Sequence, residues 1–287
     1  MKRQQWRNPT TGLAVIGPLA RSAEDLELAF DIASGPDQGE QVAWRLEIPP
    51  ARHARLSDFR VAVLPPISWL PVDEDIVAAQ DRLATGLGRL GAHVQVIQPE
   101  AFGDVREYYK LYHKLMVVQM SPGMSKETRQ QIAEWGHKTA HERGDEFLEI
   151  GAQAFEASAH EYVHAFWGRE RFRLAYRDFF RDWDVLLTPV TFTLAFRHSD
   201  APPEVDRDDL TLTVNGQAVR YGFLAVYPGL ATLCGQPATA FPFGLTRHGL
   251  PIGLQAIGPY LEDHTPLRFA ALVAQEFGGY QTPPGYV

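Results

Sequence analysis

The sequence predicts an α/β fold in which strands and helices form layers. Short runs of apolar and β-branched residues, at 60–64 and 93–97, are typical of buried strands. Longer segments lie between and after them, and their apolar residues recur at helical spacing. Glycine or proline marks the ends of most of these segments. The 287 residues are enough for one large domain or two small ones.

The first predicted helix begins near Ala23. Ser22 and Asp25 fit the capping pattern in which a hydroxyl accepts a backbone N–H one turn into the helix. Apolar residues then recur on one face, at Leu26, Phe30 and Ala33. Gly35-Pro36 predicts a left-handed cap followed by a residue that cannot continue the helix.

A strand, a helix and a second strand are expected next. Residues 60–64 form the first strand, Asp73 opens the helix and Gly91 ends it, and residues 93–97 form the second strand. Because the crossover between the two strands is long, we expect them to pair in parallel.

The middle of the chain, residues 104–182, has an almost wholly helical pattern and is rich in aromatic residues, which predicts a helical layer or an inserted helical lobe. Residues 184–188 return to a strand, and a loop-rich polar segment then runs to about Arg220. Two further strands are predicted at 238–241 and 252–257. The last helix is expected to begin at Thr265, with Pro266 at its first position.

Composition and charge argue against several classes of protein. Hydrophobic residues make up 45% of the chain and charged residues 22%, which is typical of a globular domain. A net charge of −8 disfavours binding to nucleic acid or to an anionic membrane. We interpret the short basic run at 169–173 as a solvated helix face. The single Cys234 excludes an internal disulfide and fits a reducing, cytoplasmic setting.

A glycine motif near the second strand resembles a nucleotide site. Gly86, Gly88 and Gly91 match the dinucleotide-binding fingerprint letter for letter. That fingerprint must follow a strand and open a helix, whereas these glycines close a helix and precede a strand. We therefore expect no nucleotide at this motif, and we expect no cofactor in the chain.

A second motif offers an alternative enzyme. His160 and His164, with Glu161 between them, match the pattern in which two imidazoles bind zinc and a glutamate acts as the base of a peptidase. No second motif marks a third ligand. His137 and His141 show the same spacing, so such pairs arise readily in this helical region. A zinc peptidase is the runner-up hypothesis, and histidines on a helix surface are its structural alternative.

Five segments, in order along the chain, resemble the amidase signature family. Residues 17–25 (GPLARSAED) are similar to its Gly-Pro-Met-Ala-Arg-Thr-Val-x-Asp segment. Residues 33–37 (ASGPD) are similar to the Ala-Gly-x-Asp segment at which its helix ends. Residues 184–189 (DVLLTP) resemble its Asp-x-Leu-Leu-x-Pro strand. Residues 235–238 (GQPA) and 249–258 (GLPIGLQAIG) resemble its Gly-x-Pro-Ala and Gly-Leu-Pro-Val-Gly-x-Gln-x-x-Gly signatures.

The resemblance implies a mixed β-sheet flanked by helices and an amide hydrolase with a Ser, cis-Ser and Lys triad. In the family these residues belong to the N-terminal half, in and upstream of a Gly-Gly-Ser-Ser-Gly-Gly segment that this sequence lacks. Residues 1–287 are therefore identified as the C-terminal part of a single amidase domain, incomplete at its N-terminal side. Three accounts stay open: a fragment of an amidase, a subunit complemented by an N-terminal chain, and an inactive descendant that binds.

The resemblance also supplies a candidate site. The family often has Asn-x-x-Gly before Gly-x-Pro-Ala, and Thr232 stands at the asparagine position. Thr232 and Cys234 are the predicted substrate-pocket residues, and a turn into a buried strand is the structural alternative. No catalytic residue is predicted. The expected ligand of the complete enzyme is a small amide, and the expected partner is an N-terminal amidase half or a second copy of the chain.

Overall fold

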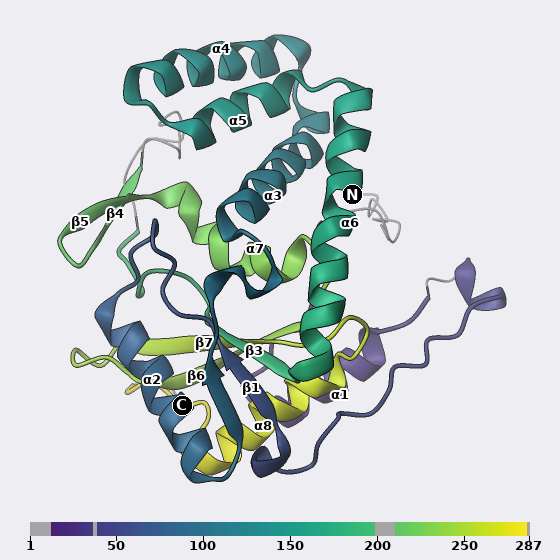
Figure 1. The fold of residues 1–287 in the computed structure, drawn as a ribbon, viewed down its shortest axis with the longest axis vertical. Coiled ribbons are helices and arrows are strands. Elements are labelled where there is room, and N and C mark those ends of the chain that lie inside the picture. Colours follow the sequence, from purple (N-terminus) through teal and green to yellow (C-terminus); the bar gives the residue numbers. More distant parts are fainter. Residues whose placement is uncertain (1–12, 37–38, 199–209, 286–287) are drawn as a thin grey trace.

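A computed structural model describes residues 13–36, 39–198 and 210–285 (Figure 1). Its central feature is a five-stranded sheet in the order β2-β1-β3-β7-β6. β1 pairs in parallel with β2 and β3, whereas β7 is antiparallel to both β3 and β6. The predicted parallel strand–helix–strand unit and the mixed sheet are confirmed. The strands are β1 (Arg60–Val63), β2 (His93–Val96), β3 (Val185–Pro189), β6 (Ala238–Leu245) and β7 (Pro251–Ile257).

Three helices accompany the sheet: α1 (Ala23–Ala33), α2 (Glu74–Arg89) and α8 (His264–Phe277). α2 contacts β3 and β7, α8 contacts β6 and β7, and α1 packs on α8. Ser22 Oγ accepts a hydrogen bond from Asp25 N at 3.0 Å, which confirms the predicted N-cap. No residue of α1 is fully buried, but Leu26 and Phe30 of its predicted apolar face are half-buried.

The other long helices form the lobe that the sequence predicts for residues 104–182. α3 (Val105–Met120) and α6 (Ala159–Asp182) extend away from the sheet, and α4 (Lys126–Arg143) and α5 (Glu146–Glu156) lie at the far end (Figure 1). α7 (Val226–Thr232) contacts α3. No helix of the described residues is long and apolar enough to cross a bilayer. Short 3-10 helices are η1 (Glu40–Val42), η2 (Leu56–Asp58), η3 (Pro99–Phe102), η4 (Ser121–Gly123) and η6 (Tyr221–Ala225).

Aromatic side chains hold the lobe together. Tyr108 of α3 meets Phe172 of α6 edge to face, with ring centroids 4.8 Å apart. Phe102 stacks on Tyr176 of α6 at 4.9 Å. Both geometries are favourable for aromatic pairs. Aromatic side chains within residues 104–182 therefore form much of the contact between α3 and α6.

The buried Asp184, just before β3, joins β3 to β1 and to the loop before β1. Its carboxylate accepts hydrogen bonds from Arg52 Nη1 at 3.0 Å, Arg60 Nη2 at 2.7 Å and Arg60 N at 2.9 Å. His53 Nε2 lies 3.1 Å from Oδ2. Burial by itself would raise the pKa of this carboxyl, but the hydrogen bonds from Arg60 and Arg52 outweigh it and lower the pKa to about 2.

The segment before Arg220 differs from its prediction as a loop. β4 (Thr211–Val214) and β5 (Gln217–Arg220) form an antiparallel hairpin. Asn215 and Gly216 at its turn have φ values of 49° and 78°. An Asn-Gly pair with two positive φ angles is the usual two-residue hairpin turn. The sequence prediction overlooked this signal and the alternation of Leu212 and Val214 with threonines before it.

Three element ends also differ from the prediction. α8 begins at His264, so Pro266 is its third residue. Proline costs no hydrogen bond there, because N–H groups in the first turn have no acceptor within the helix. α1 ends with Ser34 in an extended conformation and Gly35 at φ 133°, outside the left-handed helical region. β6 continues to Leu245, beyond its predicted end at 241.

Gly86→Ala is expected to lower the free energy of unfolding by about 1 kcal/mol. A Cβ atom at position 86 would come within 2.6 Å of the Phe277 ring, where α2 meets α8. Gly88→Ala is the matched control, because nothing lies within 4 Å of its Cβ in the same helix. This control should gain about 0.5–1 kcal/mol from helix propensity. Urea denaturation compares the two variants, and equal stabilisation of both would show that Phe277 moves aside freely.

Candidate functional site

Cys234, a predicted pocket residue, lies just beyond α7 and is fully buried. Tyr108 and Tyr176 both donate their hydroxyls to the carbonyl of Leu230, at 2.6 and 3.0 Å. Arg173 Nε donates to the carbonyl of Cys234 at 3.3 Å. Burial raises the pKa of the Cys234 thiol to about 11, so the thiol is protonated at neutral pH. An activated cysteine needs a lowered pKa, and this one has the opposite.

Thr232, the other predicted pocket residue, is the last residue of α7 and is half-buried. Its hydroxyl donates to the carbonyl of Pro228 at 3.0 Å, one turn earlier in the same helix. This bond satisfies the hydroxyl within α7. Thr232 and Cys234 therefore share one corner of the lobe, and their role in a substrate pocket stays a prediction.

Arg169 lies close to this corner and corrects the interpretation of residues 169–173 as a solvated face. Its side chain is among the largest fully buried ones, with 2% of the residue exposed. The guanidinium lies 4.1 Å from the centroid of the Phe166 ring. Its Nε has no hydrogen-bond partner within the described part of the chain. Burial, followed by the neighbouring Arg173, lowers the pKa of Arg169.

A sequence signal for this burial exists. Five of the six buried residues of α6 follow one another at steps of three and four, and Phe180 is the sixth: Ala165, Arg169, Phe172, Tyr176, Phe179. Arg169 thus occupies a position of the apolar stripe, whereas Arg171 and Arg177 lie on the exposed side. The basic composition of residues 169–173 favoured an exposed surface. The helical spacing of the buried residues, however, places Arg169 on the buried face of α6.

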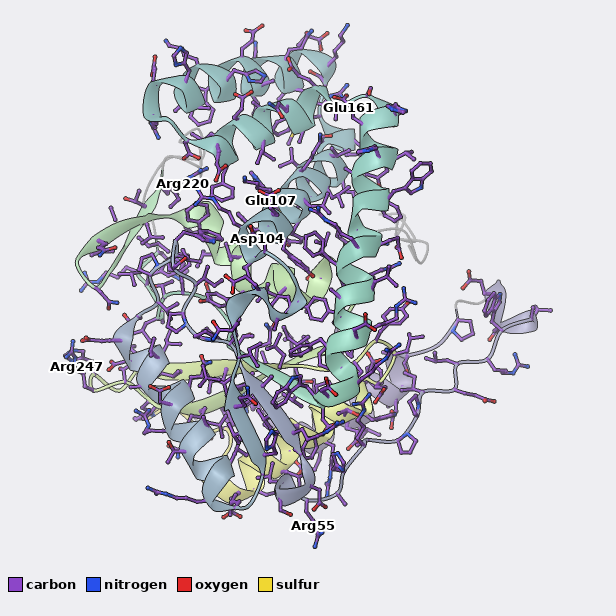
Figure 2. The ribbon with its side chains drawn as sticks, viewed as in Figure 1. Arg55, Asp104, Glu107, Glu161, Arg220 and Arg247 are labelled. Atoms are coloured by element: carbon purple, nitrogen blue, oxygen red, sulfur yellow. The ribbon has the colours of Figure 1, made fainter. Side chains whose placement is uncertain are left out.

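The zinc-peptidase hypothesis is not supported. Glu161 sits in the first turn of α6 (Figure 2). Its carboxylate accepts from Ser158 N at 2.8 Å, and Ser158 Oγ donates to it at 2.7 Å. This capping box explains the glutamate without a metal. His160 and His164 are exposed. In the ranges that the structure covers, no group of three or more acidic, histidine or cysteine side chains could hold a metal ion.

The glycine fingerprint has the context that the sequence indicates. Gly86 and Gly88 lie inside α2, and Gly91 follows it with φ 95° before β2. A helix N-terminus that could face a pyrophosphate is missing at this point, because α2 ends here.

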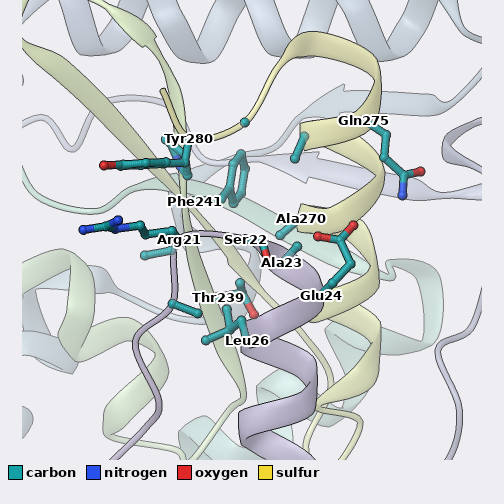
Figure 3. Close-up of a pocket in the computed structure, with 15 residues that line it drawn as sticks. Arg21, Ser22, Ala23, Glu24, Leu26, Thr239, Phe241, Ala270, Gln275 and Tyr280 are labelled. Carbon is teal, nitrogen blue, oxygen red and sulfur yellow. The ribbon is translucent and has the colours of Figure 1, made fainter. Parts of the chain in front are cut away.

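A hollow of about 390 Å³ lies along the outer edge of β6 (Figure 3). Residues 239–242 of β6 form one wall, and the start of α1 and the face of α8 that carries Ala270 and Ala274 form the others. At one end the Arg21 guanidinium lies 5.7 Å from the Tyr280 ring centroid. The walls come from segments far apart in sequence, so no local pattern predicts this hollow. Alanines line much of it: Ala20, Ala23, Ala240, Ala270 and Ala274.

Cys234 is expected to react with a thiol reagent such as DTNB roughly 100-fold more slowly in the folded chain than in urea. The raised pKa and full burial both reduce the accessible thiolate. Because the chain has a single cysteine, the reagent reports on this residue alone. Fast stoichiometric labelling under native conditions would show that the corner opens and that the thiol is not the inert group described above.

The mixed sheet and the helical lobe define an α/β protein. Among the described residues, the corner at Cys234 has no metal-binding cluster and no thiolate. Comparison with known proteins identifies the family. The family model described as Amidase matches residues 4–267. A glutamyl-tRNA(Gln) amidotransferase subunit of Saccharolobus solfataricus is 24% identical over 273 residues, covering 88% of this chain and 52% of the relative. Two solved structures share the fold with TM-scores of 0.62, and each alignment covers 93% of this chain and 55% of the other. They are the corresponding amidotransferase subunit from Thermotoga maritima, at 18% identity, and 6-aminohexanoate cyclic dimer hydrolase, at 22%.

The chain belongs to the amidase family, since the family model covers most of its length. The likeness to the solved structures confirms the α/β fold with its mixed sheet. The chain spans about half the length of the relatives that it matches.

Proposed function

We propose that residues 1–287 are the C-terminal part of an amide-hydrolysing amidase domain that works with an N-terminal segment carrying the Ser, cis-Ser and Lys group. One observation carries this proposal. The family model spans residues 4–267, yet the matching relatives are about twice as long as the aligned region. Cys234 does not replace the missing group, because its thiol is buried and protonated.

In this proposal the chain supplies one wall of the substrate pocket. Thr232 and Cys234 lie at the corner between α7 and β6, next to the Gly-x-Pro-Ala segment that resembles the family signature. A small amide is the proposed substrate class. Several relatives are named as subunits of an amidotransferase, which supports an assembly with another polypeptide. The cytoplasmic setting that we propose fits a chain with a single cysteine.

The test begins with the DNA upstream of the Met1 codon. We expect it to encode, in any frame, a polypeptide with a Gly-Gly-Ser-Ser-Gly-Gly segment. Co-expression of that polypeptide with the 287-residue chain should give hydrolysis of simple amides, measured as the release of ammonia. Replacing the nucleophilic serine of the added polypeptide by alanine is the control, and it should abolish turnover without preventing co-purification.

Two results would contradict the proposal. One is amide hydrolysis by the purified chain alone, especially if Cys234→Ala removes it, because the nucleophile would then lie within these residues. The other is a co-purified pair without turnover, which would favour the account of an inactive descendant that binds.

A further inference from the structure

A second hollow, also of about 390 Å³, lies between the C-terminal part of α6 and the loop that follows β7. Tyr176 and Phe180 of α6 line it and are buried. Pro259 and Tyr260 line it from the loop, and Tyr260 is 48% exposed. Gln236, between α7 and β6, lines it too. We call it the α6 hollow, and its volume is in the range of small-molecule sites.

Arginines at four-residue steps give this side of α6 a positive charge. Arg173, Arg177 and Arg181 follow one another at the spacing of neighbours on a helix surface, where like charges repel. Arg173 pairs with Glu170 at 2.9 Å, and Arg181 pairs with Asp178 at 3.1 Å. Arg177 lines the α6 hollow and forms no ion pair with any described residue. An anion beside Arg177 would therefore relieve the repulsion along this row.

The other buried charges at the α6 hollow already compensate each other. Arg52 Nε donates to Glu262 Oε2 at 2.6 Å, and Arg52 Nη2 donates to Glu262 Oε1 at 2.7 Å. Arg52 Nη1 donates to Asp184 at 3.0 Å. This bidentate pair neutralises the Glu262 carboxylate and engages all three nitrogens of Arg52. Arg177 is thus the cation that stays available to a ligand.

Gln236 offers an amide group that the described residues do not use. The residue is only 8% exposed, and its buried Oε1 accepts no hydrogen bond from them. Most buried polar side chains are hydrogen-bonded, so a buried amide that makes no structural bond points to a role in binding. The other end of the amide, Nε2, is a donor of the kind that a carboxylate accepts.

The loop beside the α6 hollow is held in an unusual conformation. Leu261 has a φ angle of 62°, in the left-handed region that leucine rarely adopts. The two bonds from Arg52 hold the next residue, Glu262. The ring of Tyr260 lies with its centroid 5.8 Å from the Arg173 guanidinium. Backbone strain of this kind is often found at ligand sites, where the surrounding structure maintains it.

We propose that the α6 hollow binds a small carboxylate with a planar apolar body, such as an aromatic acid. Arg177 pairs with the carboxylate, Gln236 Nε2 donates to it, and the apolar body lies against Tyr260. A guanidinium matches a carboxylate in shape and charge. A phosphate dianion fits less well, because a single unpaired guanidinium balances one negative charge. This binding needs no N-terminal segment and is independent of the proposed function.

Calorimetric titration of the 287-residue chain with benzoate at low salt tests the proposal. Benzoate combines a carboxylate with a planar ring, and benzamide has the same shape without the charge. We expect saturable binding of benzoate and binding of benzamide that is weaker by about tenfold or more, because the charge-assisted bonds are lost. Saturating benzoate should also raise the midpoint of thermal unfolding.

Two variants locate the site. Arg177→Gln should weaken benzoate binding about tenfold or more, and Gln236→Leu about threefold or more. Arg171→Gln is the matched control, because Arg171 is also exposed on α6 but does not line the α6 hollow. It should bind benzoate as the unmodified chain does. Circular dichroism checks that the variants are folded, and the exposed position of Arg177 keeps the test open if Gln236→Leu does not fold.

Three results would overturn the inference. Equal affinity of the unmodified chain and Arg177→Gln for benzoate would place the binding site elsewhere. Tighter binding of inorganic phosphate than of benzoate would show a phosphate site in place of a carboxylate site. No saturable heat at about 10 mM benzoate would show that the α6 hollow takes no such ligand. None of these results affects the proposed function, whose test is the release of ammonia by the co-expressed pair.

Discussion

Asp184→Asn is expected to lower the free energy of unfolding by about 3–5 kcal/mol, the usual effect of breaking a buried ion pair. The carboxylate is fully buried and accepts bonds from Arg52 and Arg60. Asparagine has the size of aspartate but carries no charge. Only its carbonyl oxygen can accept hydrogen bonds, whereas the carboxylate accepts them at both oxygens. Arg60 would then lose its ion-pair partner, and Arg52 would keep only Glu262 as a counter-charge. Urea denaturation at pH 7 measures the loss.

Asp178→Asn is the matched control. Asp178 pairs with Arg181 at 3.1 Å near the end of α6, but both side chains are mostly exposed. Surface pairs of this kind contribute less than about 1 kcal/mol. Losses of similar size in the two variants would show that the Asp184 cluster is as dispensable as a surface pair.

The same carboxylate predicts a pH dependence. Because the pKa of Asp184 is lowered from 3.8 to about 2 in the folded chain, its stabilising effect is complete above pH 4 and is lost as the pH falls toward 2. Other carboxylates titrate in this range too, so the informative quantity is the difference between the unmodified chain and Asp184→Asn. That difference should shrink between pH 4 and pH 2. A constant difference would mean that the pKa of Asp184 is unshifted.

Local patterns predicted most of the fold, because the signals for these elements lie within a few residues. The Ser22 cap, the β1-α2-β2 unit and the helical lobe all follow from spacing and capping residues. The hairpin at 211–220 was missed although both of its signals are local: Leu212 and Val214 alternate with threonines, and Asn215-Gly216 is a hairpin turn pair. The ends of α1 and α8 depend on backbone angles that the sequence leaves open.

The candidate site was less predictable. Cys234 and Thr232 came from a resemblance, and the packing of Tyr108 and Tyr176 around this corner depends on helices far apart in sequence. The hollow beside β6 unites three distant segments, so only the folded chain shows it. An open sheet edge is likewise a property of the whole sheet, because no single strand carries the information about what lies next to it.

Arg169→Met is expected to raise the free energy of unfolding by about 2 kcal/mol. The guanidinium is removed from water, and its pKa is lowered by burial and by Arg173, which means that the charged form is destabilised where it stands. Contact with the Phe166 ring recovers part of this cost, about 1–2 kcal/mol for a cation over an aromatic face. Methionine is unbranched, fills a similar length of space and still contacts the ring.

Arg177→Met is the control for this prediction, since Arg177 is on the same helix and exposed. It should change stability by less than about 0.5 kcal/mol. Thermal and urea unfolding of both variants gives the comparison. If Arg169→Met destabilises the chain, the guanidinium contributes more through packing and its ring contact than its desolvation costs. If it stabilises the chain as expected, Arg169 is a buried cation that forms no ion pair with the described residues, and a carboxylate from another polypeptide would then reverse the sign of the effect.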